Sequence, residues 1–127
     1  MGVHFSALLS AAERVGTTVT RRADAKRLQS ADGRFTSRAL YPTNDPGAAE
    51  FYELYLAPHS SESAEAHRPG TSENLIVTVG QLELHFGSET HLLGVGDSIV
   101  FAADLPHRYV NPGKDPCWMY LVMNYAR

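Results

Sequence analysis

The sequence has little cysteine, no long apolar run and no excess of positive charge. Its one cysteine, Cys117, cannot form an internal disulfide, so the 127-residue chain is not a disulfide scaffold. A single thiol also fits the reducing cytoplasm. The apolar runs are far too short to cross a bilayer, and the N-terminal residues do not have the pattern of a secretory signal. We therefore expect a cytoplasmic protein with no membrane partner.

Charged residues are nearly balanced over the whole chain. Eleven basic and 14 acidic residues give a formal net charge of -3, which argues against a free-standing nucleic-acid binder. Residues 14–38 depart from this balance, because their basic residues far outnumber Asp24 and Asp32. This basic segment is either a solvated face or a surface that lies near DNA or an acidic neighbour.

The remaining composition and its patterning indicate one all-β domain behind a short helix. Apolar residues fall at helical spacing only in residues 4–14, and Gly16 would end that helix. Beyond it, short segments separated by glycine and proline are typical of a sandwich or barrel. The predicted strands are residues 17–22, 34–41, 50–56, 74–79, 82–86, 90–93, 97–101, 107–110 and 117–125, with residues 59–66 as a loop.

Alternation along the strands predicts which side chains point inward. His107, Tyr109 and Asn111 would share the inner face of one strand. Arg38 and Glu53 stand in the middle of predicted strands, where they either face solvent or, if inward, recognise a polar ligand. The residues assigned to the core and the pocket floor are Cys117, Trp118, Met119, Leu121 and Met123.

Two segments punctuated by glycine resemble the paired motifs of the cupin superfamily, G(X)5HXH(X)3-4E(X)6G and G(X)5PXG(X)2H(X)3N. The segments are residues 66–80 (AHRPGTSENLIVTVG) and 96–111 (GDSIVFAADLPHRYVN). The matching residues are His67, Glu73 and Gly80 in the first motif, and Gly96, His107 and Asn111 in the second. The departures are Ser61, Pro69, Ala102 and Asp104, of which Pro69 replaces the second histidine of the family. The resemblance implies a small all-β cupin barrel, a double-stranded β-helix or jelly roll, with a short N-terminal helix.

The resemblance also implies where a ligand would bind. The family's metal shell is three histidines and one glutamate, of which this chain retains His67, Glu73 and His107. Two histidines and one carboxylate still suit a divalent metal such as Fe, Mn, Ni or Zn. The alternative is a metal-free pocket in which these residues and Tyr109 form hydrogen bonds with an organic ligand. Pro69 fixes the backbone where a ligand would have been, which weakens a metal site.

The pattern HRPGTSEN…GQLEL…GDSIVFAADLPHRYVNPG is similar to the C-terminal cupin domain of XRE-family transcriptional regulators. This resemblance implies that residues 17–127 form a sensor domain that binds a small-molecule effector and forms a homodimer. DNA would be bound only through a helix-turn-helix domain absent from this chain. Residues 1–16 would be a short helix, as a remnant of that domain or a linker from it.

Two other functions remain open. The first is a small metal-dependent cupin enzyme of the dioxygenase or isomerase type, in which His67, Glu73 and His107 hold the metal. The second is a dimerisation domain with a vestigial pocket. No Ser-His-Asp or Cys-His arrangement is visible, so we assign no catalytic residue. The resemblance to the regulator domain favours the sensor over the enzyme.

Overall fold

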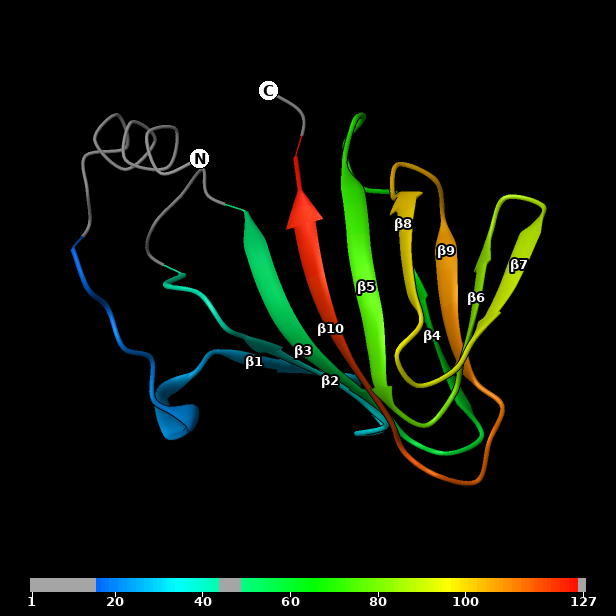
Figure 1. The fold of residues 1–127 in the computed structure, drawn as a ribbon, viewed down its shortest axis with the longest axis horizontal. Coiled ribbons are helices and arrows are strands. Elements are labelled where there is room, and N and C mark those ends of the chain that lie inside the picture. The colour runs from blue at the N-terminus through cyan, green and yellow to red at the C-terminus, as the bar shows by residue number, and fades with distance from the viewer. Residues whose placement is uncertain (1–15, 44–48, 126–127) are drawn as a thin grey trace.

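The computed structural model describes residues 16–43 and 49–125, which form two antiparallel sheets (Figure 1). The six-stranded sheet has the order β1-β2-β3-β10-β5-β8, and the four-stranded sheet has the order β4-β9-β6-β7. The strands are β1 (Arg27–Gln29), β2 (Phe35–Ala39), β3 (Glu50–Leu56), β4 (Ser60–Ala64), β5 (Ser72–Val79), β6 (Leu82–Phe86), β7 (Glu89–Leu93), β8 (Ser98–Ala102), β9 (His107–Asn111) and β10 (Cys117–Asn124). A 3-10 turn, η1 (Arg22–Asp24), precedes β1. It is the only helix in these two ranges, and its three residues cannot cross a membrane.

The core lies between the two sheets, because alternate residues of each strand point inward. On β5, Leu75 and Val77 are buried, whereas their neighbours Asn74 and Ile76 are exposed. The four-stranded sheet contributes Leu84, among others, from β6 to the same core. Each fully buried leucine stabilises the fold by roughly 1.5–3 kcal/mol. The predicted all-β jelly-roll barrel is confirmed, and the helix predicted over residues 4–14 lies outside the described residues.

The predicted strand boundaries need three corrections. Residues 17–22 are not a strand, because their β-branched residues find no partner strand and the chain instead turns into η1. The predicted loop at residues 59–66 contains β4, which pairs with β9 through its backbone. Its sequence, SSESA, has no apolar alternation that would have indicated a strand. The short strand β1 was also not predicted, since all three of its residues are exposed.

Strand β10 separates the core from the outer surface of the six-stranded sheet. Met119, Leu121 and Met123 point into the core, as predicted. Trp118 was wrongly grouped with them, because it points outward and pairs with Tyr55 of β3. The thiol of Cys117 is fully buried, and burial raises its pKa to about 11. Cys117 is therefore a small core residue, as predicted, and is inert toward reagents in water.

Gly80 explains why the first motif closes on a glycine. It forms the turn between β5 and β6 with a φ of 81°, in the left-handed region. A Cβ atom at this position would lie 2.3 Å from the carbonyl oxygen of Pro116. The glycine therefore allows the end of β5 to pass closely beside the segment that leads into β10.

Candidate functional site

Three potential ligand residues from separate elements meet inside the barrel. His67 lies in the loop between β4 and β5, Glu73 lies on β5, and His107 begins β9. One nitrogen or oxygen atom of each lies within 4.8 Å of the others. His67 Nε2 is 3.3 Å from Glu73 Oε2, and His107 Nε2 is 3.2 Å from the same oxygen. The residues singled out by the motif spacing are thus brought together around one carboxylate.

The loop that carries His67 is held by backbone hydrogen bonds to the end of β8. The His67 N–H donates to the carbonyl of Ala103 at 2.9 Å, and the Ala103 N–H donates to the carbonyl of Thr71 at 2.8 Å. Gly70 completes the intervening turn with a φ of 83°. Because both ends of the loop are tied to one segment, the His67 ring is directed at Glu73 before any ligand binds.

Glu73 is a buried carboxylate with one oxygen unpartnered. The residue is 1% exposed, and its Oε1 accepts a hydrogen bond from the hydroxyl of Tyr109. Its Oε2 has no hydrogen-bond partner within the described residues, although two imidazoles lie nearby. Burial of an ionised carboxylate is costly unless it is paired, so this oxygen is suited to a cation or to a donor group of a ligand.

The orientation of His107 places a second buried, unpartnered atom beside the Glu73 carboxylate. Its Nδ1 lies 2.8 Å from the carbonyl oxygen of Leu105, which can only accept, so Nδ1 carries a proton. Nε2 is left without a hydrogen bond within the described residues and lies beside Glu73. Burial opposes the charged imidazole, but the nearby Glu73 carboxylate and the Leu105 carbonyl outweigh it, so the pKa of His107 is raised. A ring held by a backbone carbonyl in this way is typical of metal-binding histidines.

Tyr109 and Asn111 follow His107 on the inner face of β9, as predicted, but they have different roles. Tyr109 is 4% exposed, and burial together with the charge of Glu73 raises the pKa of its hydroxyl well above the usual value. It therefore remains a neutral donor to Glu73. Asn111 instead donates from Nδ2 to three backbone carbonyls, including that of Asp115 at 2.8 Å. Asn111 thus fixes the loop before β10 and does not reach the ligand cluster.

A cavity of about 360 Å³, here called the inner pocket, opens beside the cluster. His67, Glu73 and Tyr109 line it, whereas the His107 side chain has no exposed surface and is not part of the lining. Leu121 and Met123 form part of its wall, as predicted. The lining residues that were not predicted include Phe35, Tyr52, Glu62 and Tyr125. Tyr52 could have been found from its shared face with Leu54, but Glu62 stands on the strand that was predicted to be a loop.

The donor set of the cluster fits a divalent cation. Two imidazole nitrogens and one carboxylate oxygen converge, and two of these atoms are buried without a hydrogen-bond partner among the described residues. A cation between them would satisfy both atoms at once. The family's second histidine is replaced by Pro69, which lies in the exposed turn before β5. The chain therefore offers three ligands and leaves other coordination positions to water or a small molecule.

The mid-strand charges Arg38 and Glu53 are on the opposite side of the six-stranded sheet. They are direct cross-strand neighbours in β2 and β3 and point outward. Arg38 Nε and NH2 lie 2.9 and 2.8 Å from Glu53 Oε1. The Tyr120 hydroxyl donates to Glu53 Oε2 at 2.9 Å. Both side chains thus lie on the outer side of their strands, but they are only 16% and 12% exposed and pair with each other, so the predicted solvent-facing orientation is only partly right.

Comparison with known proteins agrees with this fold. The cupin domain model matches residues 52–123, so the chain belongs to the cupin family. The HTH-type transcriptional regulator SutR of Escherichia coli (strain K12) is 28% identical over 89 residues, which cover 70% of this chain and 50% of SutR. The chain is a cupin domain homologous to those of XRE-family transcriptional regulators.

Two solved structures show the same relationship. The cupin domain of an XRE family transcriptional regulator from Enterobacter cloacae has a TM-score of 0.69 and 26% identity, covering 74% of this chain and 99% of that one. An HTH_3 family transcriptional regulator from Vibrio cholerae has a TM-score of 0.68 and 25% identity, and the match covers 76% of this chain and 53% of the regulator. This chain thus spans about half the length of SutR and of the Vibrio regulator.

Proposed function

We propose that this chain is the effector-sensing domain of a transcriptional regulator. A small molecule binds in the inner pocket and contacts His67, Glu73 and Tyr109, with His107 supporting Glu73 from behind. The observation that carries the proposal is that Glu73, a buried carboxylate with one unpartnered oxygen among the described residues, lines a pocket of ligand size. Homology to the cupin domains of regulators supports the same reading.

The lining of the inner pocket suggests the chemistry of the effector. Leu54, Leu121 and Met123 offer an apolar wall. Tyr52 of β3 and Glu62 of β4 add polar groups to the lining. An effector with an apolar body and one or two hydrogen-bonding groups would match this lining. Sensing then requires that the effector binds one arrangement of the domain better than another.

A thermal-shift screen of the purified chain against a panel of metabolites tests this proposal. We expect at least one compound to raise Tm by about 5 °C at saturation, because a ligand that binds only the folded state stabilises it. The same compound should lose most of its effect on the Tyr109→Phe variant. A panel without a single saturable shift would contradict the sensor function.

The effector site includes a divalent metal in this proposal. His67, Glu73 and His107 would hold Fe, Mn, Ni or Zn, and the bound metal would supply a Lewis-acid position for an oxygen of the effector. Metal analysis after loading and gel filtration tests it, with about one equivalent expected for the wild type. His107→Ala should lose the metal and His91→Ala, which changes an exposed histidine on β7, should keep it. Retention of metal by His107→Ala would contradict this ligand set, and a wild type that binds no metal would make the pocket a metal-free site.

The same three ligands favour one alternative function, a small metal-dependent enzyme of the dioxygenase or isomerase type. Two histidines and one carboxylate leave coordination positions open for a substrate. The two functions differ in outcome after ligand binding. A sensor returns its effector unchanged, whereas an enzyme would convert it, which mass spectrometry of the bound compound after incubation would detect.

We also propose that the domain forms a homodimer through the outer face of β5 and β8. Ile76, Val79 and Val100 point outward there and are 38%, 46% and 68% exposed. A second copy of the chain would cover this apolar area. Sedimentation analysis should show a dimer that Val100→Glu dissociates. Leu92→Glu, an exposed leucine on the other sheet, is the control and should remain dimeric.

The placement of the domain in a longer regulator completes the proposal. Residues 17–127 would be the cupin domain, and residues 1–16 would connect it to a helix-turn-helix domain outside this chain. That domain alone would bind DNA, and the regulator would act in the cytoplasm. The coding sequence upstream of Met1 tests this arrangement, because a helix-turn-helix reading frame is expected there.

A further inference from the structure

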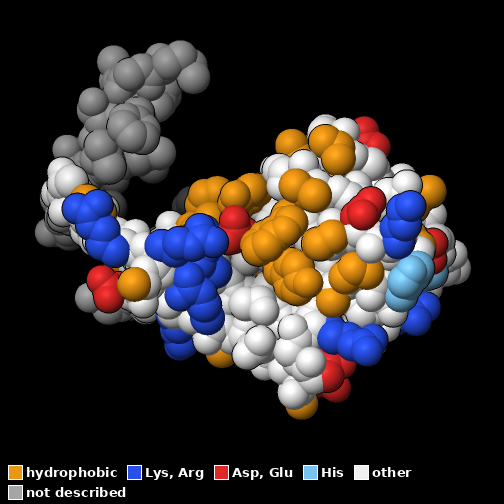
Figure 2. All heavy atoms as spheres, turned by 90° about the horizontal axis from the view of Figure 1, so that it is seen from below, with side chains coloured by type: hydrophobic (Ala, Val, Ile, Leu, Met, Phe, Trp, Pro, Cys, Tyr) orange, Lys and Arg blue, Asp and Glu red, His pale blue; other side chains and the backbone are white. Residues whose placement is uncertain are grey.

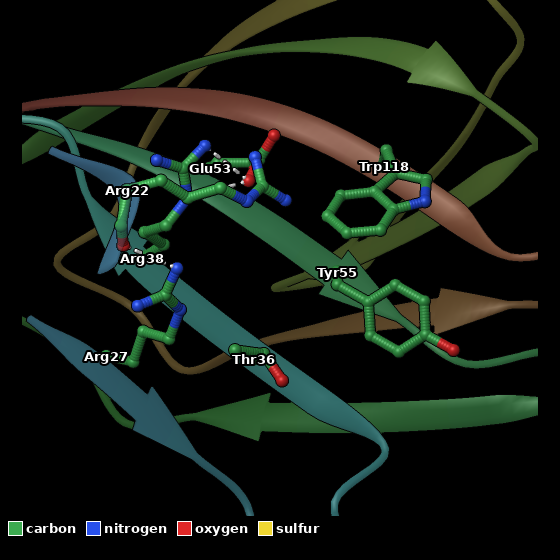
Figure 3. Close-up of a pocket in the computed structure, with 7 residues that line it drawn as sticks. All are labelled: Arg22, Arg27, Thr36, Arg38, Glu53, Tyr55 and Trp118. Atoms are coloured by element: carbon green, nitrogen blue, oxygen red, sulfur yellow. Dashed lines mark hydrogen bonds and ion pairs between the residues drawn. The ribbon is translucent and has the colours of Figure 1, made fainter. Parts of the chain in front are cut away.

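A second cavity lies on the outer side of the six-stranded sheet. It has a volume of about 240 Å³, and we call it the outer pocket (Figure 3). Arg22, Arg27, Thr36, Arg38, Glu53, Tyr55 and Trp118 line it. Figure 3 shows the guanidinium groups at one end, the Tyr55 and Trp118 rings at the other, and Thr36 between them. The outer pocket is separated from the inner pocket by the strands β2, β3 and β10, so it is a distinct site.

The single carboxylate of the outer pocket is already occupied. Arg38 approaches Oε1 of Glu53 with two nitrogens, and the Tyr120 hydroxyl donates to its Oε2. Burial opposes ionisation of this carboxyl, but the hydrogen bonds from Arg38 and Tyr120 and the charges of Arg38 and Arg22 hold its pKa below the usual value of 4.5. Glu53 therefore carries a negative charge that forms an ion pair with Arg38, and this pair forms part of the pocket wall.

Two further guanidinium groups are left without a carboxylate. Among the described residues, no Asp or Glu oxygen lies within 4.0 Å of Arg22 or Arg27. Arg27 NH1 and NH2 donate to the backbone carbonyls of Ala25 and Arg22, which orients its guanidinium but does not neutralise it. Asp24, the acidic residue of η1, lines a different cavity. Seen from below, basic side chains gather beside an apolar area on this side of the molecule (Figure 2).

The other end of the outer pocket is aromatic. The Tyr55 and Trp118 rings are tilted by 56° with centroids 4.9 Å apart, and both side chains are only half-buried. Aromatic residues that are held by a neighbouring strand provide a rigid surface on which a flat ring can stack. The Thr36 hydroxyl, between the two ends, can donate and accept hydrogen bonds.

We propose that the outer pocket binds a phosphate monoester joined to a flat ring, the chemistry of a nucleoside monophosphate. A phosphate monoester carries a charge of about -1.5 to -2 at pH 7, which matches the excess of three guanidinium groups over one carboxylate among the lining residues. Arginine presents a planar fork that binds phosphate oxygens in pairs. The ring of the ligand stacks on Tyr55 and Trp118 while the phosphate contacts Arg22 and Arg27. A ligand of this kind satisfies both ends of the pocket at once.

The fluorescence of Trp118 tests the proposal directly, because it is the only tryptophan in the chain. Adenosine 5′-monophosphate is the probe, with adenosine and inorganic phosphate as separate titrations. We expect saturable quenching by the monophosphate, and binding at least about tenfold weaker for either fragment alone. If adenosine bound as tightly as the monophosphate, the pocket would be a stacking surface that does not recognise phosphate. If inorganic phosphate bound as tightly, the ring would contribute nothing to binding. Either result would overturn the proposal.

Variants locate the binding site. Arg22→Gln and Arg27→Gln, both on exposed side chains that tolerate substitution, should each weaken the monophosphate about tenfold. Arg108→Gln changes an exposed arginine on the other sheet and should leave the affinity unchanged. Glu73→Gln should also have no effect, and loss of quenching in that variant would place the ligand in the inner pocket instead. Stronger binding of a short DNA duplex than of the monophosphate would identify a nucleic-acid surface and contradict the proposal.

Discussion

Glu73 and Glu53 are two glutamates on neighbouring parts of one sheet, and they have opposite electrostatic surroundings. Each accepts a hydrogen bond from a tyrosine, Tyr109 in the first case and Tyr120 in the second. Glu53 has Arg38 against its other oxygen, so its charge is balanced. Among the residues that the structure describes, the other oxygen of Glu73 has the imidazoles of His67 and His107 nearby but no hydrogen-bond partner.

This difference separates a carboxylate that supports the fold from one that is available to a ligand. A satisfied ion pair gains nothing further when a small molecule binds, whereas an unpartnered buried oxygen gains a partner. Folded proteins tolerate such an oxygen at functional sites, where stability is commonly given up for binding. Substitutions at the two glutamates and their tyrosines should therefore have unequal effects.

The largest difference is expected between the two tyrosines. Tyr109→Phe removes the one hydrogen bond that the described residues give the buried Glu73 carboxylate, and we expect a loss of about 2–3 kcal/mol in the free energy of unfolding. Tyr120→Phe leaves Glu53 paired with Arg38 and should cost less than about 1 kcal/mol. Urea denaturation of both variants measures the difference. Equal losses would show that the two carboxylates are equally dependent on their tyrosines.

Removing the charge of Glu53 should have the next largest effect. Glu53→Gln leaves the half-buried guanidinium of Arg38 without a counter-charge, and we expect destabilisation of about 1–2 kcal/mol at pH 7. The double variant with Arg38→Gln should recover part of the loss, because no charge is then left unpaired. If the loss in the double variant equalled the sum of the two single losses, the interaction between Arg38 and Glu53 would contribute nothing to stability.

The pH dependence of the same pair should be smaller and has a defined sign. The pKa of Glu53 is held below 4.5 in the folded protein, so the unfolded chain binds this proton more readily. The stability that the pair contributes is therefore fully present above about pH 4.5 and is lost as the pH falls through the lowered pKa. The difference between wild type and Glu53→Gln should therefore shrink as the pH falls from 5 to 3. A difference that is constant over this range would contradict the assignment.

The smallest change in stability is expected for Glu73→Gln, and it is a gain where the preceding substitutions cause a loss. In Glu73→Gln the amide oxygen can still accept from Tyr109, while the amide nitrogen can donate to the free Nε2 of His107. We expect the ligand-free variant to be as stable as the wild type or more stable by up to about 1 kcal/mol. Thermal denaturation without metal checks this. Clear destabilisation would show that the ionised carboxylate already has a partner in the folded chain.

The sequence predicted the inner cluster more fully than the outer pocket, for a physical reason. His67, Glu73 and His107 occur at spacings that a jelly-roll barrel imposes, so motif matching was sufficient to group them. The outer pair depends on the register of β2 against β3, which places Arg38 opposite Glu53 and is not visible in either strand alone. Trp118 was misplaced because both faces of β10 are apolar, which leaves no alternation to assign its side chain.

The strands β3 and β10 carry alternate residues to two different binding environments. Leu54 and Leu121 line the inner pocket, while their neighbours along the chain, including Tyr55 and Trp118, face the outer one. In evolutionary terms, substitutions at even and odd positions of one strand can adjust two ligand preferences independently. An insertion or deletion of one residue would exchange the two sets of side chains and damage both at once. We therefore expect relatives to diverge here by point substitution and to keep the lengths of these two strands.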